Sequence, residues 1–358
     1  MPATLDIALT RTAVPKALPD ERNLGFGRYF TDHMYRVDWD RAQGWHGARI
    51  EPNAPLALDP AAAVLHYAQA IFEGGKAFRG ADGRVRFFRL MDHCRRFERS
   101  AAGLAMPGVP ADEMAQAIME LVRVDEGWVP RGRGTALYIR PTLIATEAFL
   151  GVRAAERYAA YVILSPVGAY WGGDGVKCIR LWLEESRVRA AKGGIGWVKA
   201  AANYAASMPA ALEAKQRGYD QVLWTDAVHH AEIEEAGTMN VFVRIGDTVV
   251  TPPLDGTILP GMTRQSAIQL LRDWDVAIEE RPITVSELRA AASAGTLREV
   301  FGAGTAAVIS PVGTLGTALG EIMVGDGQPG ELARRLHAGI TAVQYGEVED
   351  RHGWMTEL

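Results

Sequence analysis

The stretch that decides the fold is a glycine-rich loop that runs into a series of alanines: KGGIGWVKAAANY, residues 192–204. Its three glycines predict a loop, and the following small residues predict a helix that continues to a stop at Gly218. Lys199 is therefore expected where the loop becomes a helix. Desolvation and a helix N-terminus both favour the neutral amine, the form of lysine that attacks a carbonyl group. The alternative is a solvated lysine at an ordinary helix start.

Lysine is scarce in this chain, because arginine supplies nearly all of the 38 basic residues. The lysines are Lys16, Lys76, Lys177, Lys192, Lys199 and Lys215. Only Lys199 combines small neighbours with a helix start. It is therefore the candidate for a covalent bond to a carbonyl compound.

Composition indicates a globular protein with two domains. The chain has 358 residues, of which 48% are hydrophobic and 23% charged, and its net charge is -5. This charge gives no electrostatic reason to bind nucleic acid or an anionic membrane. The first residues do not resemble a signal peptide, and no apolar stretch is long enough to span a bilayer. Cys94 and Cys178 are too few for a disulfide framework, so a reducing cytoplasm is the expected location.

Periodicity predicts a mixed α/β fold. Residues 1–25 are expected to form an N-terminal arm, residues 26–165 a small α/β domain, residues 166–175 a linker rich in glycine, and residues 176–358 a larger C-terminal domain. In the small domain we expect a strand at 26–37, a helix from Asp59 that ends at Gly74, a hairpin at 76–88 and helices at 90–104 and 111–126. Strands are expected at 136–144 and 159–164. Strands and helices then alternate in the C-terminal domain.

Three features are suited to an anion. LPGMT at 259–263 precedes a predicted helix, so Met262 and Thr263 can offer backbone amides and a hydroxyl to a phosphate. FGAGTA at 301–306 is a small-residue loop with a further hydroxyl, that of Thr305. Arg96 lies on a basic helix and can offer the bidentate grip that phosphate favours. Each feature alone is common in proteins as a structural element.

An acidic segment, AEIEEAGTMN at 231–240, lies beside a predicted hairpin. Its three carboxylates are either a solvated turn or include one that faces inward and pairs with a protonated ring nitrogen. A lysine, phosphate-binding loops, an arginine and such a carboxylate are together what pyridoxal 5'-phosphate requires.

The sequence resembles the branched-chain amino-acid aminotransferases, pyridoxal-phosphate enzymes of fold type IV. The resemblance runs from about Phe26 to the end of the chain. It is carried by LHYAQAIFEG at 65–74, LYIRP at 137–141, EAGTMN at 235–240, LPGMT at 259–263, FGAGTA at 301–306 and VQYG at 343–346. It implies two domains with the cofactor in the cleft between them, and a homodimer in which the partner helps to close the pocket.

The resemblance also implies roles for single residues. Lys199 forms the internal aldimine with the cofactor and then carries the proton, Glu235 keeps the pyridine nitrogen protonated, and Tyr204 bonds the ring hydroxyl. The phosphate is held by Arg96, Met262, Thr263 and Thr305. The substrate carboxylate is bordered by Thr238, Thr305 and Ala306. The side-chain pocket is walled by Phe26, Tyr67, Phe72, Tyr138 and Tyr170, with Arg140 beside it to accept a glutamate side chain.

The implied reaction is reversible transfer of an amino group between L-leucine, L-isoleucine or L-valine and 2-oxoglutarate, in a ping-pong cycle through pyridoxamine phosphate. One apolar pocket should accept all three amino acids with modest discrimination, because a methylene is worth only about 1 to 3 kcal/mol there. No metal is expected, since the histidines form no ligand pattern with the two cysteines.

The sequence departs from the family in two places. Ala202 stands where the family usually has glycine before the Asn-Tyr pair, and the Cys-x-x-Cys pair of some animal members is replaced by Ala307 and Ser310. The second departure predicts that the protein has no thiol switch of that kind.

Other functions remain open at the sequence level. Gly302 and Gly304 with Glu321 form an incomplete dinucleotide-binding pattern, because Ala307 stands where the third glycine belongs. A catalytically silent binding protein with this fold is a second alternative. A relative of the same fold type with another substrate, such as a D-amino-acid transaminase, an amine transaminase or aminodeoxychorismate lyase, is a third.

Overall fold

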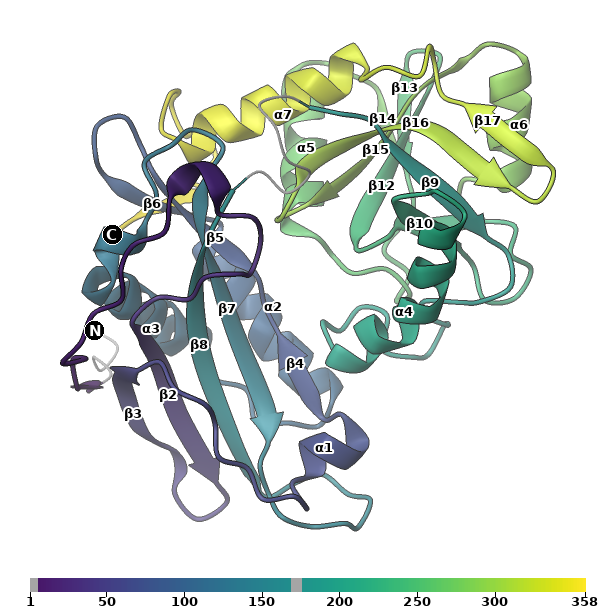
Figure 1. Cartoon of the computed structure of the whole chain (residues 1–358). Coiled ribbons are helices and arrows are strands. Elements are labelled where there is room, and N and C mark those ends of the chain that lie inside the picture. Colours follow the sequence, from purple (N-terminus) through teal and green to yellow (C-terminus); the bar gives the residue numbers. More distant parts are fainter. Residues whose placement is uncertain (1–5, 169–175) are drawn as a thin grey trace. The chain divides into compact units, whose positions relative to one another are not determined.

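The computed structural model describes residues 6–168 and 176–358, and divides the chain into two compact units (Figure 1). Unit 1 comprises Met1–Gly173, Val198–Ala202 and Val343–Leu358. Unit 2 comprises Asp174–Trp197 and Asn203–Ala342. A short segment that contains Lys199 therefore belongs to unit 1, although its neighbours on both sides in the sequence belong to unit 2.

Unit 1 is built on one sheet with the strand order β1-β3-β2-β8-β7-β5-β6-β18, and β4 pairs with β7 beside this path. Its strands are β1 (Ala8–Leu9), β2 (His33–Asp40), β3 (Gly44–Pro52), β4 (Ala70–Phe72), β5 (Gly75–Arg79), β6 (Val85–Phe88), β7 (Ala136–Ala145), β8 (Arg157–Val167) and β18 (Met355–Glu357). Its helices are α1 (Ala63–Tyr67), α2 (Leu90–Gly103) and α3 (Ala111–Val124), with short 3-10 turns at Glu21–Asn23 and Glu126–Trp128. Helices α2 and α3 lie together on one face of the sheet (Figure 1).

The hairpin β5–β6, the helices α2 and α3 and the strands β7 and β8 confirm the sequence-based predictions for these elements. Helix α2 is amphipathic and buries Cys94, Phe97 and Ala101 among others.

Two predictions for unit 1 were wrong. The expected strand at 26–37 begins only at His33, because Gly25 and Gly27 adopt positive φ angles of 63° and 69° that turn the backbone away from an extended path. The expected helix from Asp59 to Gly74 is limited to α1. Ala68 takes a left-handed conformation with φ 51° and ends the helix, after which the chain extends as β4 and pairs with β7.

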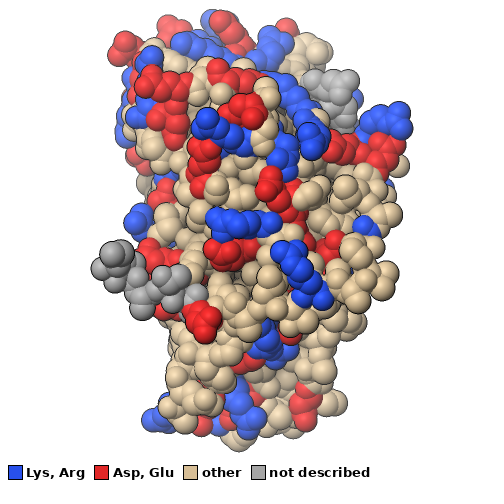
Figure 2. All heavy atoms as spheres, turned by 90° about the vertical axis from the view of Figure 1, so that its left-hand side faces the viewer, with Lys and Arg blue, Asp and Glu red and all other residues tan. Residues whose placement is uncertain are grey.

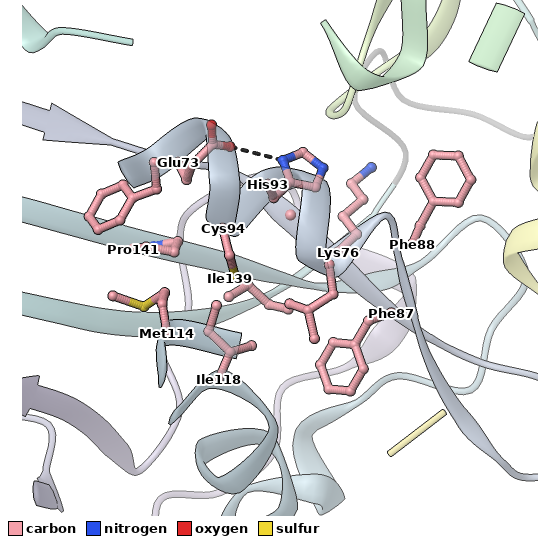
Figure 3. A pocket seen from close by; sticks show the side chains of 13 residues that line it. Glu73, Lys76, Phe87, Phe88, His93, Cys94, Met114, Ile118, Ile139 and Pro141 are labelled. Carbon is pink, nitrogen blue, oxygen red and sulfur yellow. Dashed lines mark hydrogen bonds and ion pairs between the residues drawn. The ribbon is translucent and has the colours of Figure 1, made fainter. Parts of the chain in front are cut away.

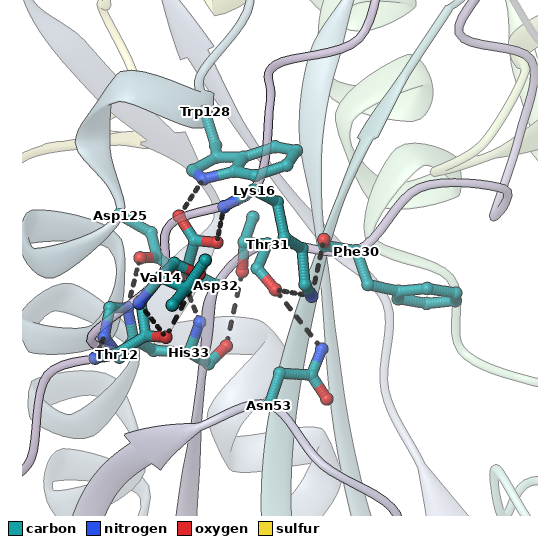
Figure 4. A network of polar contacts seen from close by, with 10 residues as sticks. All are labelled: Thr12, Val14, Lys16, Phe30, Thr31, Asp32, His33, Asn53, Asp125 and Trp128. Atoms are coloured by element: carbon teal, nitrogen blue, oxygen red, sulfur yellow. Dashed lines mark hydrogen bonds and ion pairs between the residues drawn. The ribbon is translucent and has the colours of Figure 1, made fainter.

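The N-terminal arm is bound to the sheet of unit 1 by a network of polar contacts (Figure 4). The backbone amide of Thr12 donates to His33 Nε2 at 2.9 Å, and His33 Nδ1 lies 2.7 Å from the buried carboxylate of Asp125. Lys16 donates through its backbone amide to Asp32 at 2.8 Å and through Nζ to the carbonyl of Thr31 at 2.7 Å. Because these contacts join the arm to strand β2 and to its neighbours, this part of the arm is fixed to unit 1.

Unit 2 contains a second sheet with the strand order β11-β10-β9-β16-β15-β12-β13-β14, and β17 pairs with β16. Its strands are β9 (Ile179–Glu184), β10 (Gln221–Thr225), β11 (Ile233–Ala236), β12 (Met239–Ile245), β13 (Thr248–Thr251), β14 (Ile278–Glu280), β15 (Leu297–Gly304), β16 (Val308–Thr317) and β17 (Gly320–Met323). The helices are α4 (Ala201–Gln216), α5 (Met262–Asp273), α6 (Val285–Ser293) and α7 (Glu331–Gln344); α4 starts and α7 ends in segments of unit 1. The hydroxyl of Thr284 caps α6 by accepting from the backbone amide of Glu287 at 3.0 Å.

The predicted linker at 166–175 lies mostly outside the described residues. Strand β8 continues to Val167, two positions into that range. The domain boundaries drawn from the sequence stay a prediction.

The surface carries charges of both signs. On the face drawn in Figure 2, lysine and arginine side chains are interspersed with aspartate and glutamate. Among the described residues, no helix is both long and apolar enough to cross a membrane.

Candidate active site

Lys199 is held in unit 1 by backbone contacts on both of its sides. Its carbonyl accepts from the amide of Phe72 at 3.1 Å, and its amide donates to the hydroxyl of Ser100 at 3.2 Å. The next residue, Ala200, forms an isolated β-bridge with Ile71. Lys199 thus lies two positions before α4, at the change from loop to helix that the sequence predicted.

The side chain of Lys199 points to an aromatic group. Its Nζ lies 4.8 Å from the ring centroid of Phe72. The Arg140 guanidinium lies 4.7 Å from the same ring and 5.1 Å from that of Tyr138, and it donates to the Tyr138 hydroxyl at 2.8 Å. Phe26 packs edge-on against Tyr138 with their centroids 5.0 Å apart. Unit 1 therefore gathers Lys199 and four of the predicted pocket residues into one cluster.

Tyr67, another predicted wall residue, is bonded to a loop of unit 1. It is the last residue of α1, is 41% exposed, and its hydroxyl donates to the carbonyl of Leu150. The other predicted wall residue, Tyr170, lies outside the described residues.

Arg96 is buried, and one edge of its guanidinium is bound to a carboxylate. Its Nε and Nη2 donate to Glu73 at 2.6 Å and 2.9 Å. The guanidinium of Arg96 was expected to bind a phosphate, but its Nε–Nη2 edge forms an ion pair with Glu73 within unit 1.

In unit 2, Glu235 is a buried carboxylate with a cationic partner. Arg189 Nε lies 2.5 Å from one of its oxygens, and the side-chain amide of Asn240 donates to the other at 3.2 Å. The same Asn240 amide donates to the carbonyl of Leu259 at 2.8 Å. Of the three acidic residues in the segment 231–240, Glu232 is exposed, whereas Glu234 and Glu235 are both buried. Arg189 and Asn240 fix the orientation of Glu235, as a partner of a ring nitrogen requires.

A small pocket of unit 2 brings together three predicted residues. Its lining consists of Arg189, Asn203, Tyr204, Ser207, Glu235, Gly237, Thr238 and Leu259. Tyr204 lies in the first turn of α4, and Thr238 lies in the tight turn between β11 and β12. A carboxylate, a phenol and a hydroxyl thus share one cavity.

The remaining predicted residues of unit 2 lie at the start of α5 and in the turn between β15 and β16. Met262 and Thr263 form the start of α5 and are buried. The N-cap of α5 is Gly261, which has no side chain to cap the first amides, so these amides suit an anion. Thr305 and Ala306 lie in the turn between β15 and β16. They do not line the pocket that contains Glu235.

These groups fit pyridoxal 5'-phosphate. A buried carboxylate with its own cation suits a protonated pyridine nitrogen, and an uncapped helix start suits a phosphate. No cluster of three or more His, Cys, Asp or Glu side chains that could hold a metal occurs in the part of the chain that the structure describes.

Sequence reasoning missed two residues of this site. Glu73 lies within a quoted motif but received no role, although a glutamate between Phe72 and Gly74 in an apolar segment was a signal. Arg189 gave no signal, because nothing in the sequence relates it to Glu235, 46 positions later.

The model of the class IV aminotransferases matches residues 70–314, and the chain belongs to this family. Among its relatives is branched-chain-amino-acid transaminase 1 of Bacillus subtilis, which is 47% identical over 348 residues, 97% of this chain and 98% of the relative.

Solved structures of branched-chain amino acid aminotransferases show the same fold. That of the Escherichia coli enzyme has a TM-score of 0.73 and 26% identity, covering 89% of this chain and 98% of the other. That of the Thermoproteus uzoniensis enzyme, solved with norvaline, has a TM-score of 0.72 and 26% identity, covering 90% of this chain and 99% of the other. The Thermobaculum terrenum enzyme, solved in its holo form with pyridoxal phosphate, has a TM-score of 0.72 and 25% identity, covering 91% of this chain and 98% of the other. The two-unit architecture is therefore that of fold type IV.

Proposed function

We propose that this protein is a pyridoxal-phosphate-dependent branched-chain-amino-acid transaminase. It transfers an amino group reversibly between L-leucine, L-isoleucine or L-valine and 2-oxoglutarate in a ping-pong cycle. The observation that carries the proposal is the position of Lys199 Nζ, 4.8 Å from the Phe72 ring in a cluster with Phe26, Tyr138 and Arg140. The relatives support it, because the Thermobaculum terrenum enzyme was solved with pyridoxal phosphate and the Thermoproteus uzoniensis enzyme with the apolar amino acid norvaline.

The bound cofactor supplies an electron sink that makes the proton on the substrate's α-carbon acidic. Lys199 binds the cofactor and moves that proton at its Nζ. Glu235, held by Arg189 and Asn240, keeps a proton on the ring nitrogen, and Tyr204 bonds the ring hydroxyl. The phosphate is assigned to Arg96, Met262, Thr263 and Thr305.

The substrate is bound by its two ends. Thr238, Thr305 and Ala306 border its carboxylate. Phe26, Phe72 and Tyr138 supply an apolar wall for the branched side chain, and Arg140, stacked on two of these rings, accepts the second carboxylate of glutamate. The same pocket can accept either a branched side chain or the carboxylate of glutamate, because the Arg140 guanidinium packs on the rings of Phe72 and Tyr138.

We further propose a homodimer. Five large apolar side chains are exposed on α1 and on the loop that contacts it, namely Leu65, Tyr67, Phe149, Leu150 and Val152. The loop is joined to the α1 region by a bond from the Phe149 amide to the Ala61 carbonyl at 3.1 Å. Such a patch is costly in water and suits a second copy of the chain. The two cysteines favour a cytoplasmic location.

The test is the absorption spectrum of the purified protein before and after addition of L-leucine alone. We expect a band of lysine-bound cofactor that converts to the pyridoxamine form, and we expect this band to be missing in Lys199→Ala. Lys192→Ala is the matched control, because its side chain is 76% exposed and pairs with Asp255. A band that ignores L-leucine but responds to D-alanine would assign the protein to a D-amino-acid transaminase. A protein that cannot be loaded with the cofactor would overturn the proposal.

A further inference from the structure

A buried carboxylate that the reaction does not use directly lies beside the candidate site. Glu73 is 1% exposed and accepts four hydrogen bonds: two from Arg96, at 2.6 Å and 2.9 Å, one from His93 Nδ1 at 2.9 Å and one from the Gly74 amide at 3.0 Å. Figure 3 shows the bond between Glu73 and His93. Burial alone would raise the pKa of Glu73, but the Arg96 charge and the hydrogen bonds hold this pKa well below its ordinary value. The carboxylate is therefore ionised and fully bonded.

The cavity below this group offers no room for a substrate. It is lined by Lys76, Phe87, Cys94, Met114 and other largely apolar side chains, and its volume of about 10 Å³ is that of one water at most. Glu73 therefore acts through the side chains that it binds, those of Arg96 and His93.

The end of β4 and helix α2 contact both Arg96 and Lys199. Arg96 and Ser100 are four positions apart on α2, on one face of the helix, and the Ser100 hydroxyl accepts from the Lys199 amide. Phe72, the neighbour of Glu73, bonds the Lys199 carbonyl. Glu73 thus joins the end of β4 to α2, the two elements that bind the backbone of Lys199.

The bond to Glu73 also fixes the guanidinium. An arginine side chain has many rotamers, and most of its freedom is lost when its planar fork is bound by a carboxylate. The Nε and Nη2 groups of Arg96 are both bound to Glu73, and these two bonds set the plane in which the guanidinium lies. A fixed donor binds an anion more tightly than a mobile one, because less conformational entropy is lost on binding.

We propose that Glu73 is a positioning residue that orients Arg96 toward the cofactor phosphate, and that His93 fixes the orientation of Glu73. This assignment rests on the proposed function, in which Arg96 binds that phosphate. Glu73 itself does not touch the cofactor.

The test compares two ligands of the apoprotein, pyridoxal 5'-phosphate and pyridoxal, which lacks the phosphate. Glu73→Gln keeps the size of the side chain but turns a donor toward Arg96 or His93. We expect the affinity for pyridoxal 5'-phosphate to fall by roughly tenfold or more, as when partners that orient a ligating group are removed, with the affinity for pyridoxal unchanged. In an Arg96→Gln background, Glu73→Gln should have no further effect on either affinity.

The matched control is Asp125→Asn, which disrupts another buried acid–histidine pair of unit 1, the one with His33. This variant should lose stability but keep the preference for the phosphate. If Glu73→Gln lowers both affinities equally, or leaves the preference intact, the positioning role is wrong. If Glu73→Gln does not fold, His93→Gln is measured instead, and an unchanged preference there would equally overturn the role. A wild-type protein that binds no pyridoxal 5'-phosphate would overturn the proposed function itself.

Discussion

Phe72 and Lys199 are joined twice, by a backbone hydrogen bond of 3.1 Å and by a contact of 4.8 Å between Lys199 Nζ and the Phe72 ring. The ring also carries the Arg140 guanidinium at 4.7 Å. One aromatic side chain therefore contacts both the amine proposed for chemistry and the cation proposed for substrate recognition.

Replacing Phe72 with leucine should keep the backbone bond and remove both cation–ring contacts. Because each contact contributes on the order of 1 kcal/mol, we expect kcat/KM for L-leucine to fall by roughly tenfold. Steady-state kinetics with L-leucine and 2-oxoglutarate measure this. Phe78→Leu, at a buried ring that packs on Tyr345, is the control and should reduce stability without this loss. Equal activity of Phe72→Leu and the wild type would show that the ring plays no part.

Gly74 is required by the position of Tyr138. A Cβ at this position would lie 2.0 Å from the Tyr138 hydroxyl oxygen and 2.8 Å from Cζ, which is closer than atoms can approach. Gly74→Ala should therefore displace Tyr138 and lower activity by at least about tenfold, and Tyr138→Phe in the same chain should restore part of it. Gly127→Ala, where no atom lies within 4 Å of the new Cβ, is the control. Failure of the second substitution to restore any activity would argue against this contact.

The ion pair of Arg189 and Glu235 is buried, with side-chain exposures of 8% and 4%. Arg189→Leu leaves the carboxylate buried without its cation, so we expect the free energy of unfolding of the apoprotein to fall by about 3 kcal/mol. Adding Glu235→Gln should recover part of this loss, since the buried charge is then removed. Urea unfolding of the wild type and of these two variants measures the changes. Arg187 has a side chain that is 46% exposed, so Arg187→Leu should change stability little. An equal loss of stability in Arg187→Leu would show that burial of the ion pair is not the cause.

Glu234, the neighbour of Glu235, predicts a pH dependence of stability. Burial raises the pKa of Glu234 from 4.5 to about 7, and one of its carboxylate oxygens has no hydrogen-bond partner. The folded state is therefore penalised for ionising this group, and the penalty grows as pH rises from the unfolded pKa to the folded one and is then constant.

Glu234→Gln should consequently raise the melting temperature by roughly 2 °C or more at about pH 8 and by much less at about pH 5. Thermal unfolding at a series of pH values measures this difference. Glu232→Gln, at an exposed position two residues earlier, should show no such trend. A gain that is the same at both pH values would contradict the assignment to Glu234.

Thiol oxidation should leave the enzyme active. Burial raises the pKa of the Cys94 thiol and raises that of Cys178 to about 11, so both are poor nucleophiles at neutral pH. Ala307 and Ser310, the second departure from the family pattern, carry no thiol. Activity before and after treatment with a mild thiol oxidant is the measurement, and clear loss that a reductant reverses would be evidence for a switch.

The elements that the sequence predicted well are those whose local pattern agrees with their surroundings. The hairpin β5–β6 has a turn with two glycines between branched and aromatic residues, and α2 has a regular apolar stripe. The segment 59–74 failed because its apolar spacing also suits a helix, whereas pairing of β4 with β7 requires a strand. Local periodicity does not contain that non-local hydrogen bonding.

The candidate residues followed a similar division. Lys199, Glu235 and Thr263 have local signals, namely small neighbours, an acidic segment beside a hairpin and a helix start. The ion pairs of Arg189 with Glu235 and of Arg96 with Glu73 depend on side chains that meet only in the folded chain. The sequence alone could not show that the Arg96 guanidinium binds the Glu73 carboxylate in addition to the phosphate proposed for it.

The membership of residues 198–202 in unit 1 has a consequence for how the protein forms. The bond between Lys199 and Ser100 joins residues 99 positions apart, so it closes a long loop and is expected late in folding. Before the bond between Lys199 and Ser100 forms, a chain can already contain the sheet of unit 1 and its buried Glu73, while Lys199 is still far from Ser100. Newly synthesised molecules should therefore pass through a stage that cannot yet capture the cofactor, and the rate of cofactor uptake would report on the last contacts to form.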